Sequence, residues 1–63
     1  MVALMSIEGV LYEVEQLHDV SERLVVLAEE NPPVSEALLT ISGSVRGTAT
    51  LLGVLVATKM RPV

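Results

Sequence analysis

Two consecutive prolines at the midpoint of the chain are the feature that most constrains its fold. Proline has no amide hydrogen to donate, and its ring collides with the preceding helical turn. A regular helix therefore cannot continue through Asn31-Pro32-Pro33. The 63-residue chain is thus divided at a bend, residues 31–33, into two segments of similar length.

The segment before the bend has the apolar spacing of an amphipathic helix, which we expect to run from about residue 6 to about residue 31. Ser6 is a suitable N-cap for it. Apolar residues then recur every three or four positions, at Ile7, Val10, Leu11, Val14, Leu17, Val20, Leu24, Val25, Leu27 and Ala28. Glutamates seven residues apart form a ridge on the same helix, which is typical of a solvated surface. They are Glu8, Glu15, Glu22 and Glu29.

The segment after the bend allows two interpretations. A helix over about residues 34–61 is indicated by the apolar spacing of Val34, Leu38, Ile41, Val45, Leu52 and Leu55. The alternative is an α+β fold, in which helix one is followed by a β-hairpin: residues 39–46 alternate apolar and polar, and glycines supply turns. Three glycines each cost a helix roughly 1 kcal/mol relative to alanine. We prefer the helix, because its spacing persists through the glycines.

These elements predict one all-α domain over residues 1–63, an antiparallel two-helix hairpin. Pairing about the bend should bring Val45 beside Leu17 or His18, and Leu52 beside Leu11. A domain this small buries only about 60% of its unfolded surface and usually needs disulfides, a metal or oligomerisation. The chain has no cysteine and one histidine. We therefore expect a homo-oligomer, either a four-helix bundle of two hairpins or a larger helical assembly.

The far side of the second helix is unusually free of charge for a soluble protein. A single hairpin covers one side of this helix, so the other side needs another chain or lipid. We expect the oligomer interface to include the small residues of this far side, together with one leucine. The predicted interface residues are Gly43, Gly47, Thr50, Val54, Ala57 and Leu52.

Chemistry-bearing motifs are few. Glu15 and His18 have the Glu-x-x-His spacing of carboxylate-bridged di-metal bundles. The second helix supplies no matching carboxylate, so we predict no metal site within one chain; a metal-binding oligomer with ligands from several chains stays an alternative. No serine lies in a nucleophile pattern, and a thin hairpin offers no evident pocket. We therefore predict neither an enzyme nor a cofactor.

Charge limits the partners of the chain. Its net charge is −4, from four basic and eight acidic residues, and nucleic-acid binding depends on clustered lysine and arginine. We therefore expect no nucleic-acid partner. Arg46 is the one charge between Glu36 and Lys59. We predict that it forms an ion pair with Asp19, or with a carboxylate of a neighbouring chain.

The expected function is that of a small self-associating structural or protein-interaction module in the cytoplasm, because no basic segment precedes an apolar run as in a signal peptide. A membrane protein is the alternative. Residues 37–58 are long enough to cross a bilayer, and Gly43-x-x-x-Gly47 is a spacing that lets membrane helices approach closely. Arg46 lies near the middle of this stretch, where a charge is costly in lipid.

Overall fold

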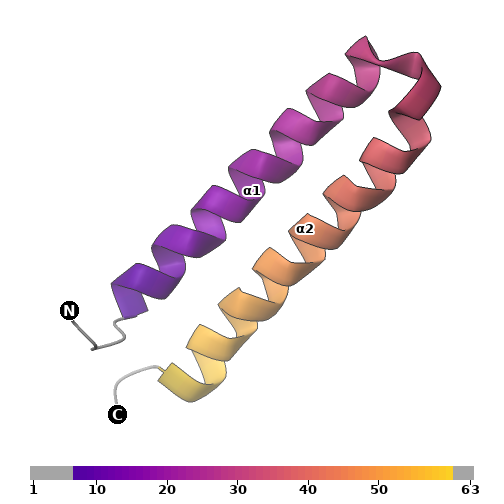
Figure 1. Cartoon of the computed structure of the whole chain (residues 1–63). Coiled ribbons are helices and arrows are strands. Elements are labelled where there is room, and N and C mark those ends of the chain that lie inside the picture. Colours follow the sequence, from indigo (N-terminus) through magenta and orange to yellow (C-terminus); the bar gives the residue numbers. More distant parts are fainter. Residues whose placement is uncertain (1–6, 61–63) are drawn as a thin grey trace, which may run out of the picture.

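The protein is an antiparallel helical hairpin (Figure 1). The computed structural model describes residues 7–60, with Met60 described by its backbone alone. Helix α1 (Ile7–Glu30) is followed by a short 3-10 turn η1 (Pro32–Val34), helix α2 (Ser35–Leu55) and a π-helical extension η2 (Val56–Met60). Within residues 7–60 there is no strand, so the all-α hairpin is confirmed and the alternative β-hairpin is wrong. The predicted N-cap, Ser6, lies outside the described residues.

The bend is built from the asparagine and the two prolines. The Asn31 side-chain amide donates a 2.8 Å hydrogen bond to the carbonyl of Leu27, and its backbone N–H donates to the carbonyl of Ala28 at 3.3 Å. These bonds satisfy two of the carbonyls that the end of a helix leaves free. The Val34 N–H then donates to the Asn31 carbonyl at 3.0 Å. Pro32 and Pro33 stand between these donors, at positions that need no N–H.

Helix α2 persists through residues that individually disfavour a helix. No glycine in the described residues has a positive φ, so none of them serves as a turn. Three threonine hydroxyls of α2 and η2 are satisfied inside the helical stretch, each donating to a carbonyl four residues earlier. Thr48 bonds Ser44, Thr50 bonds Arg46 and Thr58 bonds Val54, at 3.1, 3.1 and 2.8 Å. Local β preference therefore yields to the helical ladder and to packing against α1.

Small residues, not the large apolar ones, lie at the centre of the contact between the helices. Ser21 and Ala28 of α1 are buried, as are Ser42 and Ala49 of α2. In each pair the two residues stand seven apart, which is the repeat of a coiled-coil seam. Val34 and Ile41, two residues of the apolar spacing that predicts this helix, do not lie at this centre. Both are about half exposed, because the helix is turned so that the seam of small residues faces inward.

The register of the hairpin is set by Ser21 and Ser42, whose hydroxyl groups meet at 3.0 Å. Counting the same number of residues along each helix from this pair places Val45 level with His18 and Leu52 level with Leu11, as predicted from the bend. The same count defines layers of increasing side-chain size along the seam. From the bend outward these layers are Ala28 with Ser35, Ser21 with Ser42, Val14 with Ala49, and Ile7 with Val56.

The hairpin is a single layer and has almost no hydrophobic core of its own. Its Cα atoms extend over 48 × 25 × 12 Å, so the hairpin is long and thin. Among the described residues the buried hydrophobic side chains are Ala28 and Ala49 alone. Every leucine, isoleucine and valine of the described residues is at least partly exposed. Each helix has one neighbour, and most of its apolar surface is left without a partner.

Candidate interaction surface

The centre of the hairpin is a pair of buried serines. The Ser42 hydroxyl donates a 2.8 Å hydrogen bond to the backbone carbonyl of Ser21. A hydroxyl has one proton, so the 3.0 Å contact between the two Oγ atoms uses the proton of Ser21. No buried side-chain oxygen or nitrogen in the described residues lacks a partner. The pair favours this register of α1 on α2, because the hydrogen bonds between the helices form only when Ser21 and Ser42 lie level with each other.

The buried seam divides the hairpin surface into two faces. An antiparallel pair of helices has a local two-fold axis perpendicular to the plane of the hairpin, so equivalent positions of α1 and α2 lie on the same face. Residues one and four places before each seam position form one face, which we call the apolar face. Residues one and four places after each seam position form the other, which we call the polar face.

The apolar face is nearly free of polar groups. Apart from Glu13, Asn31 and Thr48, its members between residues 10 and 55 are leucine, isoleucine and valine. They are Val10, Leu17, Val20, Leu24, Leu27, Val34, Leu38, Ile41, Val45, Leu52 and Leu55. All of them are half-buried or exposed, and Leu27, Val34, Ile41 and Leu55 are 43–50% exposed. This is a continuous hydrophobic surface contributed by both helices.

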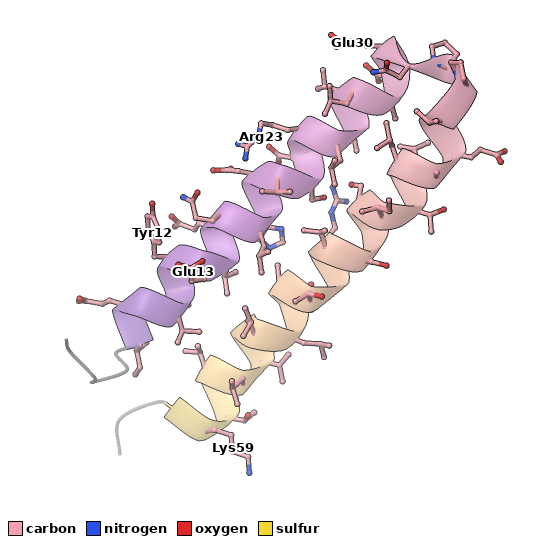
Figure 2. All side chains as sticks on the ribbon, in the orientation of Figure 1. Tyr12, Glu13, Arg23, Glu30 and Lys59 are labelled. Atoms are coloured by element: carbon pink, nitrogen blue, oxygen red, sulfur yellow. The ribbon has the colours of Figure 1, made fainter. Side chains whose placement is uncertain are left out.

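The polar face carries most of the ionisable groups. The glutamate ridge lies along its α1 edge, and Glu36 lies on its α2 edge; His18 and Arg46 stand nearer the middle. The outer side of α1 is separate from both faces: Figure 2 shows Tyr12 and Arg23 pointing away from α2. The hairpin is therefore amphipathic as a whole, with charge concentrated on one broad side.

The predicted metal-binding pair does not belong to a larger cluster in the described residues. Glu15 is exposed and His18 is half-buried, both on the polar face. Within residues 7–59, no group of three or more histidine, aspartate or glutamate side chains is placed to hold a metal ion. Ligands from several chains would be needed, and that arrangement stays a prediction.

The predicted ion pair is not formed inside the hairpin. Asp19 and Arg46 are both exposed, and neither has an ionic contact among the described residues. Asp19 lies on the outer side of α1, five places after Val14 in the seam, whereas Arg46 lies on the polar face. Pairing of Arg46 with a carboxylate of a neighbouring chain stays a prediction.

The residues predicted as an oligomer interface separate into two groups. The five smaller residues, Gly43, Gly47, Thr50, Val54 and Ala57, are exposed along the outer side and polar-face edge of α2. Leu52 is half-buried and belongs to the apolar face. A β-carbon added at Gly43 or Gly47 would meet nothing within 4 Å. The hairpin itself thus gives no packing reason for these glycines.

Alanine at both glycines is expected to stabilise the dilute hairpin by about 1 kcal/mol per site, because alanine favours a helix and there is room for its methyl group. Thermal unfolding of the Gly43→Ala/Gly47→Ala variant at low protein concentration checks this. Thr40→Ala, which introduces alanine into the same helix at a position that is not glycine, is the control. The mass at high concentration tests the predicted interface separately. A reduced mass indicates close packing across the glycines, and an unchanged mass removes them from the interface.

Sequence reasoning missed the serine pair and the apolar face. The available signal was the seven-residue spacing of small residues, Ser21 to Ala28 and Ser42 to Ala49, at equal distances from the bend. Searches against protein-family models, curated proteins and solved structures found no match to this chain.

Proposed function

We propose that the protein is a small structural module that assembles with copies of itself, with two hairpins forming a four-helix bundle as the basic unit. One observation carries this proposal: among the described residues the hairpin buries only alanines and serines, while ten large hydrophobic side chains are more than 40% exposed. Four of the ten, which are Leu27, Val34, Ile41 and Leu55, lie on the apolar face beside its half-buried leucines and valines. A contiguous exposed apolar surface marks an interaction site in soluble proteins.

The accessible area supports the same proposal quantitatively. A compact monomer of 6.7 kDa exposes roughly 3,900 Å², whereas this chain exposes 4759 Å². The excess of about 850 Å² is close to the roughly 800 Å² that each partner buries in a standard protein interface. Covering one face would bring the exposure of the chain to that of an ordinary folded protein.

The test is the mass of the purified chain in detergent-free buffer, measured by sedimentation equilibrium over a range of concentrations. We expect a dimer or a higher oligomer whose helical content falls as it dissociates, because folding and association are then coupled. A fully helical monomer at every concentration would refute the proposal.

A membrane span is the second candidate, and a specific observation favours it. Residues Pro32–Lys59 form a helical stretch of 28 residues, in which an 18-residue window has a mean hydropathy of 1.4 and is 11% buried. A helix of about 20 apolar residues crosses a bilayer. Arg46 lies near its middle and opposes insertion. Flotation with phosphatidylcholine vesicles distinguishes the two: the self-associating module stays in the aqueous fraction, and a spanning helix floats with the lipid.

A further inference from the structure

We infer that the apolar face is covered by a second copy of this chain, so that two hairpins stack with their apolar faces together and their polar faces outward. The inference rests on the self-association proposed above and names the surface that performs it.

The first argument is the distribution of apolar side chains. On the apolar face, the half-buried leucines Leu24, Leu38 and Leu52 lie beside the serine and alanine seam and are flanked by exposed leucine and isoleucine. Both helices contribute equally, so the face is wide enough to receive two helices of a partner. This is the arrangement of a four-helix bundle, in which each helix packs on two neighbours.

The second argument is electrostatic. The chain has a net charge of −4, and its glutamate ridge follows the edge of the polar face. Two copies joined by their polar faces would bring two ridges of like charge together, which opposes association. Joined by their apolar faces, the ridges point away from each other into water. Between residues 10 and 55, Glu13 is the single ionisable side chain of the apolar face, so little charge would be buried.

The third argument concerns the molecule that covers the apolar face. The interface of a symmetric dimer must be complementary to itself. A smooth face of Leu, Ile and Val meets this condition, because its recognition depends on shape and water exclusion and requires no opposite charge on the partner. The excess area estimated above is close to what each copy of a stable dimer buries, which agrees with a second hairpin of the same size as the occupant.

The chain offers a matched pair of variants to test this assignment. Ile41 lies on the apolar face and is 50% exposed, whereas Leu39, two residues away on the same helix, lies on the polar face and is 47% exposed. Ile41→Glu should weaken dimerisation by at least about 100-fold, because a two-fold dimer would bury the new carboxylate twice. Leu39→Glu should change the dissociation constant by less than about threefold, the scale of a peripheral contact. Sedimentation equilibrium measures both constants.

The outcomes separate this inference from the proposed function. A monomeric wild-type chain would remove both. An oligomeric wild-type chain dissociated by Leu39→Glu, by both variants or by neither would overturn the apolar-face assignment while self-association stands. Leu27→Glu and Leu11→Glu, at 44% and 43% exposure on α1, repeat the comparison on the other helix.

A second measurement keeps the test decisive if a glutamate variant fails to fold. The chain contains no cysteine, so a single introduced thiol reports its own environment. Ile41→Cys should react with a maleimide several-fold more slowly at high than at low protein concentration, because association covers it. Leu39→Cys should react at one rate throughout. Equal concentration dependence at both positions, or protection at Leu39→Cys alone, would overturn the assignment.

Discussion

Replacing Leu52 by aspartate is expected to dissociate and unfold the chain in one transition. Leu52 is half-buried beside the seam and belongs to the apolar face, so the carboxylate would disturb both the hairpin and the assembly that we propose. Loss of a packed leucine costs about 2–5 kcal/mol when the side chain is fully buried, and burying a charge adds to this. A chain of this length has a total stability of roughly 3–9 kcal/mol. The variant should therefore lose most of its helical circular dichroism.

The neighbouring residue provides the control for this experiment. Leu51 is 70% exposed at the outer edge of α2, and Leu51→Asp introduces the same side chain into the same helical turn. It should retain the wild-type circular dichroism spectrum and mass. If Leu52→Asp remained a folded oligomer, or if the two variants behaved alike, the half-buried flank of α2 would not be what stabilises the chain.

Leucine in place of Ser42 is expected to destabilise the hairpin by about 2–6 kcal/mol. A larger side chain in a filled seam costs about 1–3 kcal/mol. The Ser21 hydroxyl also loses its partner while it stays buried, which adds about 1–3 kcal/mol. Urea unfolding followed by circular dichroism measures the change.

Two alanine variants separate the contributions of bulk and hydrogen bonding at this position. Ser42→Ala keeps the seam narrow but leaves the buried Ser21 hydroxyl without its partner, so we expect a loss of about 1–3 kcal/mol. In Ser21→Ala/Ser42→Ala neither helix presents a buried hydroxyl, and stability should return close to that of the wild type. If the double variant were much less stable than Ser42→Ala alone, the serine pair would contribute to the free energy of unfolding as well as to the register of the helices.

The fold was predictable because its determinants are local and strong. The prolines at residues 32 and 33 fix the bend, and the apolar spacing of residues 7–28 defines α1. Helix α2 was the uncertain part, because three glycines and several β-branched residues oppose it locally. Its long-range spacing gave the correct result, since tertiary packing outweighs propensity over a helix of this length.

The rotation of α2 about its own axis was not predictable from apolar spacing alone. Val34 and Ile41 are more hydrophobic than Ser42 and Ala49, so hydrophobicity alone would turn them toward α1. The structure places the smaller residues inward, because close approach of two helices requires small side chains at the centre of the contact. The large apolar side chains that a lone hairpin leaves outside are consequently available to a second chain.

The order of the layers along the seam also affects how the chain folds. The layer of Ala28 and Ser35 lies next to the bend, where only a short loop must close, and each later layer encloses a longer one. Once the first layer has formed, each layer brings the residues of the next layer close together. The two helices can therefore pair progressively from the bend outward. The contacts within one chain are therefore expected to form rapidly. In the assembly that we propose, the slow, concentration-dependent step is then the encounter of two chains.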